Sequence, residues 1–430
     1  MPSIYPSYTF NYISHMISQI TVIGAGPSGL MAAISAASQG AKVTIAEKMN
    51  SAGKKLLATG GGRCNISNTS PMPQFINSFG NKGPFVRYAL NRFDQQQLIS
   101  FLNSKGIKTV SPDQFHIFPS SQKAAHILGA LLDEVSRLKI TILKENSISS
   151  VSRKENGLFS LRSEKMRFES RKLIFATGGK SSIPDPPSYN GYELAKSLGH
   201  SIVYPLPALC ALETEDLWVK QCAGLSLPDS VIRVRTGKKT IQGKQGVLFT
   251  HKGISGPGVL DLSASLSREI HHNGPKQVFL IAHEDNTQER WETQFLRWQN
   301  NSGSSPVQSL LSKSYPSRFS EILCRLAGVK KGLRAADLEK KARKKLVSLL
   351  CEGLPLTINK SEGFKKAMLT TGGVSLKEVN PRTMESRLQT GLYFCGEVLD
   401  ADGPCGGYNL QWAFSSGYTA GLCAAQDPNR

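Results

Sequence analysis

The sequence ISQITVIGAGPSGL, residues 17–30, decides the fold of this chain. Its first half is a short apolar run, which predicts a buried parallel strand, and residues 24–29 complete a G-x-G-x-x-G motif. An alanine-rich helix is predicted over residues 30–39, and a second apolar strand over residues 41–46 ends on Glu47. A strand, glycine-rich turn, helix, strand and acidic residue in this order predict a Rossmann-like dinucleotide-binding unit.

The positions of the glycines and of the acid match the needs of a bound dinucleotide. Gly24 allows the tight turn, Gly26 lets the backbone approach a pyrophosphate, and Gly29 lets helix and strand pack closely. The helix amino terminus offers N–H groups and a positive dipole end to phosphates. Glu47 lies 23 residues after Gly24, near the spacing of about 20 at which a carboxylate binds ribose hydroxyls. Because Glu47 would repel a 2′-phosphate, FAD or NAD fits better than NADP.

Further glycine-rich segments point to FAD. Residues 59–65 read Thr-Gly-Gly-Gly-Arg-Cys-Asn, which suits a loop whose backbone approaches a planar ligand and whose Arg63 contacts the pyrophosphate. A strand predicted over residues 172–175 ends in Ala-Thr-Gly-Gly, and a strand near the other end runs into Gly396-Glu397. A helix follows over residues 411–423. We therefore expect both ends of the chain to meet on one flavin.

These motifs resemble the HI0933-like family of flavoproteins, also called bile-acid-inducible-reductase-like or aminoacetone-oxidase-like. The similar stretches span nearly the whole chain from Ile17 onward, and the strings at 59–65 and 406–413 are the most specific. The resemblance implies FAD, Asp400 near the ribityl chain, and Asn409 to Gln411 beside the isoalloxazine. Cys405 departs from the residue that is more usual in this family.

The motifs and the resemblance together predict one set of cofactor-binding residues. The set is Gly24, Gly26, Pro27, Ser28, Gly29, Glu47, Lys48, Thr59, Gly60, Gly61, Gly62, Arg63, Cys64, Asn65, Ile148, Ala176, Thr177, Gly178, Gly179, Gly396, Glu397, Asp400, Asn409, Leu410 and Gln411.

The predicted fold class is α/β, a Rossmann-like two-dinucleotide-fold FAD domain with an inserted β-barrel and helical domain. A flexible extension is expected over residues 1–16, with Met16 a possible start. The FAD domain is expected over 17–190 and 362–426, a barrel-like domain over 191–285 and a basic helical domain over 286–361. Short β-like runs such as 231–234 and 278–282 indicate the barrel.

Bulk composition adds a charge argument and several exclusions. The 430 residues carry a net charge of +20, which favours a polyanionic partner. The eight cysteines are scattered without a Cys-x-x-Cys pair, so neither a metal site nor a redox dithiol is predicted. The sequence contains no stretch of about 18 apolar residues, so it predicts no membrane span. We expect a soluble, cytoplasmic protein of undetermined oligomeric state.

A helix predicted over residues 334–350 gathers the charge on one face, opposite Leu338, Ala342, Leu346 and Leu349. Two readings stay open, a solvated helix face or a nucleic-acid footprint, with membrane-surface binding a minor third. The basic residues are Lys330, Lys331, Arg334, Lys340, Lys341, Arg343, Lys344 and Lys345.

The chemistry is expected to be reduction of a conjugated C=C. No second G-x-G-x-x-G lies between a strand and a helix, so NAD(P)H is expected to dock transiently. Candidate proton donors are His251, Cys405 and Tyr408, while Cys64 is either catalytic or a small loop residue.

Four functions remain open. Family resemblance favours reduction of uridine to dihydrouridine in large-subunit ribosomal RNA, held by the basic insertion. A small steroid- or bile-acid-like enone is the second substrate class, and amine oxidation the third. The fourth reading is an FAD-containing RNA-binding protein without catalysis.

Overall fold

The computed structural model describes residues 17–181, 190–237 and 239–426, so the expected extension 1–16 lies outside the described residues. The chain forms two compact units, the first from residues 1–205 and 370–430 and the second from residues 206–369. The second unit therefore begins later and ends later than the expected insertion at 191–361. Apart from residues 191–205, both expected inserted domains fall within this one unit, because a strand that follows the helices returns to its sheet.

A seven-stranded sheet is the centre of the first unit, and its order is β6-β2-β1-β9-β8-β7 with β20 also paired to β9. The parallel part joins β1 to β2 and β9, β2 to β6, and β9 to β20, whereas β7, β8 and β9 are antiparallel. The strands are β1 (Ile17–Ile23), β2 (Val43–Ala46), β6 (Thr141–Leu143), β7 (Ile148–Arg153), β8 (Phe159–Ser163), β9 (Arg167–Phe175) and β20 (Leu392–Phe394).

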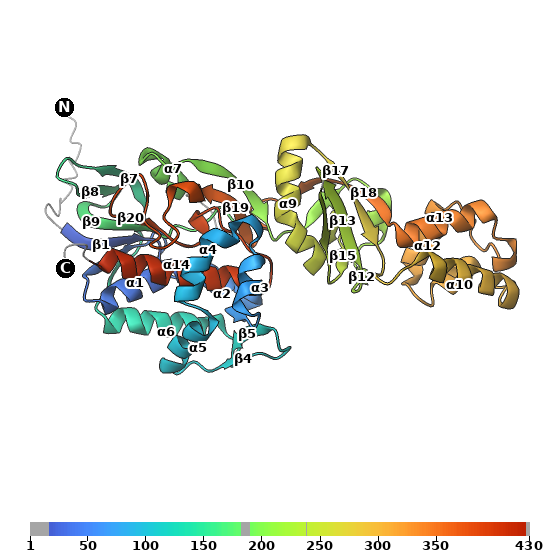
Figure 1. Ribbon diagram of the computed structural model, residues 1–430, viewed down its shortest axis with the longest axis horizontal. Coiled ribbons are helices and arrows are strands. Elements are labelled where there is room, and N and C mark those ends of the chain that lie inside the picture. Colours follow the sequence, from blue (N-terminus) through green and yellow to red (C-terminus); the bar gives the residue numbers. More distant parts are fainter. Residues whose placement is uncertain (1–16, 182–189, 238, 427–430) are drawn as a thin grey trace, which may run out of the picture. The chain divides into compact units, whose positions relative to one another are not determined.

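Two helices from opposite ends of the chain pack together beside this sheet (Figure 1), α1 (Pro27–Ser38) and α14 (Tyr408–Ala425). Their backbones nearly touch, since a Cβ on Gly417 would lie 2.3 Å from the Ser28 carbonyl oxygen. A Cβ on Gly421 would lie 2.0 Å from that of Ala32. The small residues at the carboxyl end of the chain are thus required by the close helix packing. Helix α14 begins three residues earlier than predicted, directly after Gly407, which has a left-handed backbone conformation.

A small three-stranded sheet, ordered β3-β5-β4, and several helices make up most of the rest of the first unit. They are α2 (Lys54–Ala58), β3 (Ser67–Asn68), α3 (Met72–Asn77), α4 (Gly83–Arg92), α5 (Gln95–Ser104), β4 (Thr109–Val110), β5 (His116–Pro119), α6 (Ala124–Arg137) and α7 (Asn190–Ser197). The chain passes between the units in β10 (Ile202–Ala208) and β19 (Leu369–Val374), which pair with each other.

The second unit contains an eight-stranded sheet, ordered β12-β15-β16-β11-β18-β17-β13-β14. Its strands are β11 (Leu212–Thr214), β12 (Ser226–Leu227), β13 (Val231–Thr236), β14 (Lys239–Gly243), β15 (Val247–Phe249), β16 (Gly253–Ser255), β17 (Lys276–Ile281) and β18 (Leu354–Ser361). The sequence predicted a barrel here. Within the described residues the end strands β12 and β14 do not pair, so the sheet is not closed.

Helices complete the second unit, and its core is rich in aromatic side chains such as Trp291, Phe295 and Phe319. The helices are α8 (Leu217–Gln221), α9 (Pro257–Asn273), α10 (Gln288–Asn301), α11 (Val307–Leu311), α12 (Ser317–Leu326) and α13 (Lys340–Cys351). Across the described parts of both units, no helix has the length and apolar character that crossing a bilayer requires.

Candidate functional site: a glycine-lined cofactor cradle

The first glycine loop divides into two packed glycines and one open one. A Cβ on Gly24 would lie 2.4 Å from the Ala176 carbonyl oxygen, and a Cβ on Gly29 would lie 1.9 Å from that of Gly24. By contrast, no atom lies within 4 Å of the Cβ position of Gly26, the residue that caps α1. The packing glycines close the strand–helix turn, and Gly26 leaves open space in front of the helix amino terminus, as a pyrophosphate requires.

Glu47 lies next to this loop, at the end of β2. One carboxylate oxygen accepts a hydrogen bond of 2.6 Å from the Ala25 N–H, and the other accepts one of 2.8 Å from Met49. The segment before β7 contacts Glu47 through Asn146, whose N–H donates to the Glu47 carbonyl at 2.8 Å. Ile148 follows two residues later as the buried first residue of β7. Burial lowers the pKa of Lys48, opposed by the adjacent Glu47 carboxylate.

The second glycine loop has a backbone that few other residues would adopt. Gly60, Gly61 and Gly62 have φ values of 56°, 65° and 87°, and Cys64 has a φ of 64°. Arg63 is exposed, and its guanidinium lies 5.4 Å from the centre of the Phe118 ring. The Cys64 thiol is fully buried, and burial raises its pKa to about 11. A thiol that stays protonated at neutral pH favours the loop-residue reading of Cys64 over the catalytic one.

The glycine-rich segments from the two ends of the chain are in direct contact. The Asn68 side chain donates a hydrogen bond of 2.8 Å to the Gly406 carbonyl. In the amide orientation that satisfies both of its ends, Asn65 accepts from the Gly407 N–H at 3.0 Å. A Cβ on Gly407 would lie 2.4 Å from the Ser67 carbonyl oxygen. Backbone thus meets backbone at the crossing of β3 with the start of α14.

Glu397 fixes the turn after β9. Its carboxylate accepts from the Lys55 ammonium at 2.5 Å, from the Ser181 hydroxyl at 2.9 Å and from the Thr370 N–H at 2.8 Å. A Cβ on Gly179 would lie 2.5 Å from this carboxylate. Two predicted residues, Gly179 and Glu397, are therefore neighbours. Sequence reasoning missed their partners, because single Lys, Ser and Thr residues carry no motif.

A second buried charge cluster holds Asp400. The Lys82 ammonium donates to the Asp400 carboxylate at 2.8 Å and also pairs with Asp402. Asp400 accepts a further hydrogen bond from the Gly372 N–H at 3.1 Å, and Asp402 accepts one from Thr371 at 2.8 Å. Only 10% of the Lys82 side chain is exposed, so removing one partner would leave an uncompensated buried charge. This cluster joins the segment before α4 to the carboxyl-terminal motif.

The side chains of two residues predicted beside the isoalloxazine form hydrogen bonds with the protein backbone. The Asn409 carboxamide accepts from the Gly403 N–H at 2.8 Å and donates to the Gly403 carbonyl at 2.9 Å. Gln411 is fully buried and donates to the Phe93 carbonyl at 3.0 Å. The structure therefore keeps Asn409 at the predicted loop but turns Gln411 into the core, away from the other predicted residues. Leu410 packs partly buried against the same core.

Two of the three candidate proton donors, Tyr408 and Cys405, belong to the first unit. Tyr408 is 7% exposed, and its hydroxyl lies 3.4 Å from that of Ser70. Cys405 is exposed in the loop just before it. His251 belongs to the other unit, exposed on the turn between β15 and β16.

A further imidazole was missed by sequence reasoning. His116 pairs through Nδ1 with the Asp113 carboxylate, and this hydrogen bond holds the pKa of Asp113 well below its usual range. Its Nε2 lies 3.6 Å from the Cβ position of Gly406. The Asp-x-x-His spacing in a turn was the signal in the sequence.

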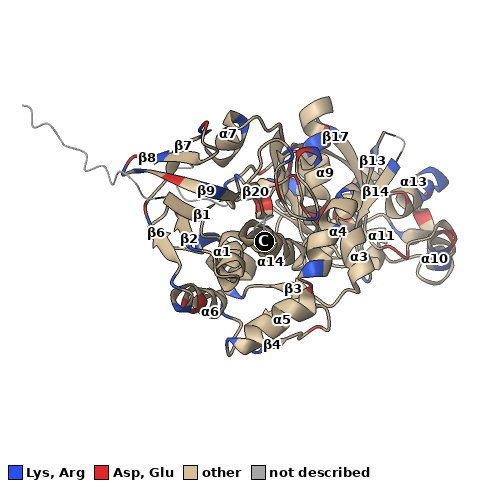
Figure 2. Cartoon of the chain, turned by 60° about the vertical axis from the view of Figure 1, so that its left-hand side comes forward, with Lys and Arg blue, Asp and Glu red and all other residues tan. Residues whose placement is uncertain are grey.

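In the second unit the basic residues before α13 do not continue the helix. Glu339 is extended, and a single 3-10 turn covers Ala335–Asp337, so the predicted helix start at Arg334 is wrong. Within α13 the apolar face is buried through Leu346, Val347, Leu349 and Leu350. The four lysines of the helix are exposed, and Figure 2 shows this charge on α13. Arg343 differs, since it donates to Gln299 at 2.9 Å.

Comparison with known proteins identifies the family. The model of the HI0933-like protein Rossmann domain matches residues 18–423. The chain belongs to the HI0933-like family. It is 32% identical over 415 residues to the 3-dehydro-bile acid delta(4,6)-reductase of Clostridium scindens, covering 96% of this chain and all of that protein. It is 31% identical over 410 residues to the ribosomal RNA dihydrouridine synthase of Haemophilus influenzae, covering 94% of this chain and 98% of that protein.

Solved structures agree with this fold. The 3-ketosteroid-delta4-(5alpha)-dehydrogenase of Rhodococcus jostii matches with a TM-score of 0.52 over 98% of this chain and 99% of its own, at 12% identity. That likeness shows the fold alone. As a member of the HI0933-like family, the chain is an FAD-dependent oxidoreductase. The open Gly26, the adjacent Glu47 and the left-handed glycine loop fit FAD. The predicted α/β class with a Rossmann-like FAD-binding domain is confirmed, whereas the predicted barrel is an open sheet.

Proposed function

We propose that this HI0933-like flavoenzyme reduces a uridine of large-subunit ribosomal RNA to dihydrouridine, with electrons from transiently docking NAD(P)H. The observation that carries this proposal is the exposed basic surface of the second unit. Within the described residues, none of the lysines of this surface is in an ion pair. These lysines are Lys330, Lys331, Lys340, Lys341, Lys344 and Lys345. We call all six the α13 lysines, although Lys330 and Lys331 precede the helix.

Electrostatics favours a nucleic acid as the partner of this surface. Six ammonium groups in no ion pair repel one another, and phosphates would relieve that repulsion while releasing counterions. The net charge of +20 adds a long-range attraction for the same class of partner. Two relatives at 31% and 32% identity, from Haemophilus influenzae and Escherichia coli, are named ribosomal RNA dihydrouridine synthase. The charge of this surface and the names of these two relatives thus favour the same class of substrate.

The residues of the cradle have separate tasks in such a reaction. Bound FAD supplies hydride-transfer chemistry. Gly26 and the start of α1 would bind the pyrophosphate, and Glu47 the ribose hydroxyls. The Lys82–Asp400–Asp402 cluster would hold the loop beside the ribityl chain. A protein acid must deliver the proton to the second carbon, and we assign this task to Cys405 or Tyr408 at the predicted flavin-side loop, or to His251.

The second candidate is reduction of a small conjugated enone. The relative from Clostridium scindens, named a bile-acid reductase, is as similar to this chain as the RNA-modifying relatives are. A small apolar substrate would make the α13 lysines irrelevant to turnover. Amine oxidation and FAD-containing RNA binding without catalysis are the remaining alternatives.

Mass spectrometry of ribosomal RNA separates these functions. Ribosomal RNA from a deletion strain is expected to lack one dihydrouridine, and the purified protein with NADPH should restore it in that RNA. A steroid enone tested in parallel should be reduced slowly or not at all. Unchanged dihydrouridine in the deletion strain, together with rapid enone reduction, would replace the first function with the second. RNA binding without reduction would indicate the non-catalytic reading.

A further inference from the structure

A second cluster of cations lies on the first unit, around Tyr88 of α4. The guanidinium of Arg87 lies 4.9 Å from the centre of the Tyr88 ring, and that of Arg382 lies 5.0 Å from it. Hydrogen bonds from these two arginines lower the pKa of Tyr88. Arg92, one turn further along α4, donates to the Arg382 carbonyl at 3.0 Å and so positions that arginine. We call these four residues the Tyr88 cluster.

This cluster has no acidic partner among the residues that the structure describes. All three arginines are exposed, and none of them is in an ion pair. Like charges held this close repel one another unless an anion lies between them. Arginine also recognises phosphate by a bidentate pair of hydrogen bonds. An exposed trio of arginines is therefore suited to a phosphate group.

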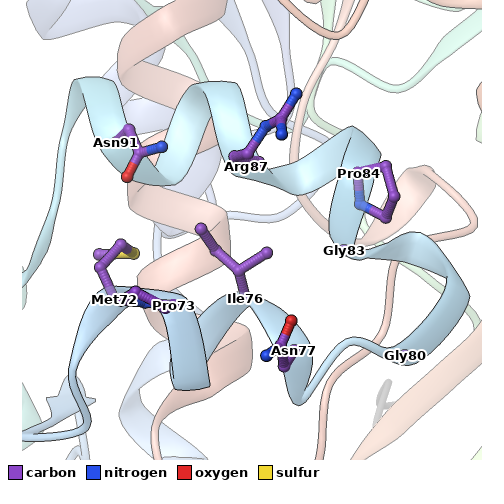
Figure 3. Close-up of a pocket in the computed structure, with 9 residues that line it drawn as sticks. All are labelled: Met72, Pro73, Ile76, Asn77, Gly80, Gly83, Pro84, Arg87 and Asn91. Atoms are coloured by element: carbon purple, nitrogen blue, oxygen red, sulfur yellow. The ribbon is translucent and has the colours of Figure 1, made fainter.

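A pocket adjoins the cluster at Arg87. It lies between α3 and α4, has a volume of about 400 Å³, and is shown in Figure 3. Met72, Pro73, Ile76 and Pro84 supply its apolar lining. Its polar groups are the Arg87 guanidinium and the side-chain amides of Asn77 and Asn91.

The two amides of this pocket are available to a ligand. Asn77 and Asn91 are both exposed, and neither side chain makes a hydrogen bond within the described residues. Amide groups can both donate to and accept from the edge of a nucleobase. Sites of a few hundred Å³ with an apolar lining and a few polar groups are typical of small-molecule binding.

We propose that the Tyr88 cluster and this pocket form a nucleotide subsite for single-stranded RNA. The arginines bind the backbone phosphate, and the pocket receives the attached base. An acidic peptide would satisfy the arginines but would leave the apolar, amide-bearing pocket without a matching group. This inference deepens the proposed function and rests on it, because it adds a binding site on the first unit for the RNA that the α13 lysines are proposed to bind.

The test compares two double variants of the FAD-loaded protein that remove the same charge from the same unit. R87Q/R382Q removes the two charges beside the Tyr88 ring, and R162Q/R167Q removes those of two exposed arginines of β8 and β9. Binding of a single-stranded ribosomal RNA oligonucleotide is measured over a range of salt concentrations. For R87Q/R382Q we expect a roughly tenfold loss of affinity and a salt slope reduced by about 0.7, the contribution of the one phosphate contact that is lost. The control should change far less.

A second comparison tests the base pocket. N77A/N91A should weaken binding of the oligonucleotide severalfold but leave binding of an abasic strand of equal length unchanged, whereas R87Q/R382Q should weaken both. Circular dichroism and flavin content confirm that all variants are folded and loaded. Equal salt slopes for R87Q/R382Q and R162Q/R167Q would overturn the subsite while leaving the proposed function in place. A wild-type protein that binds no RNA would overturn both.

Discussion

The glycine loops of the first unit and the α13 lysines of the second show two opposite ways of building a binding surface. The loops offer backbone, and their shape depends on contacts between segments from both ends of the chain, such as Asn68 with Gly406. The lysines offer side chains from one short stretch, exposed and without ion pairs among the described residues. We infer that the cradle is sensitive to single added atoms, whereas the lysine surface tolerates substitution and changes only its affinity.

The largest effect is expected from Gly29→Ala. The new Cβ would collide with the Gly24 carbonyl oxygen, 1.9 Å away, and because backbone cannot move aside cheaply, we expect a loss of at least about 3 kcal/mol in the free energy of unfolding. Thermal unfolding measures this loss. Gly26→Ala is the matched control, since no atom lies within 4 Å of its Cβ position. Compared without FAD, it should unfold like the wild type, since bound FAD would itself stabilise the fold, yet it should bind FAD poorly. Normal flavin content in this variant would contradict the assignment of Gly26 to the pyrophosphate.

Buried, paired charge in the first unit should come next in size. Glu134 is 5% exposed and accepts hydrogen bonds from Arg137 and Lys105, which lower its pKa to about 2. The stabilisation is present above the unfolded-state pKa of about 4.3 and is lost as pH falls towards about 2. Glu134→Gln should therefore destabilise the protein by about 2 kcal/mol at pH 7. Its free energy of unfolding should also fall less steeply than that of the wild type as the pH is lowered. Denaturant titrations at pH 7 and pH 3 check this, and an equal loss at both values would refute it.

Exposed, unpaired charge in the second unit should behave differently. K344Q/K345Q is expected to change the free energy of unfolding by less than about 0.5 kcal/mol but to weaken RNA binding about tenfold and to lower the salt slope by about 1.4. Salt-dependent RNA binding and denaturant titration measure the two effects. K365Q/K366Q removes two other exposed lysines of the same unit. If both double variants lose affinity equally, the α13 lysines are not a specific surface.

The smallest effect is expected from Cys64→Ala. Because burial raises the pKa of this thiol to about 11, no reactive thiolate is lost, and turnover should stay within about twofold of the wild type. Alkylation of the native protein should modify the exposed Cys405 long before Cys64. A large fall in turnover with normal flavin content would restore Cys64 as a catalytic candidate.

Much of the cradle could be predicted from sequence because its motifs are local. Residues 17–47 form strand, turn, helix and strand in one continuous stretch, and Gly29 packs against Gly24 of the same motif, although Gly24 also packs against the distant Ala176. The charge clusters could not be predicted, because Lys82 and Asp400 are separated by 318 positions. The start of α13 was also misjudged. Residues 334–339 continue the helical pattern of charges, but the backbone at Glu339 is extended.

The sequence by itself determined the cofactor class, the order of the Rossmann elements and the excess of positive charge, because composition and short-range backbone geometry are properties of neighbouring residues. Only the tertiary structure decided that Gly26 faces open space, that Gln411 turns into the core, and that Arg87 and Arg382 share Tyr88. The physical reason is that packing acts between segments that are distant in the chain. Which side of a residue is buried, and which charges lack partners, is set only when those segments meet.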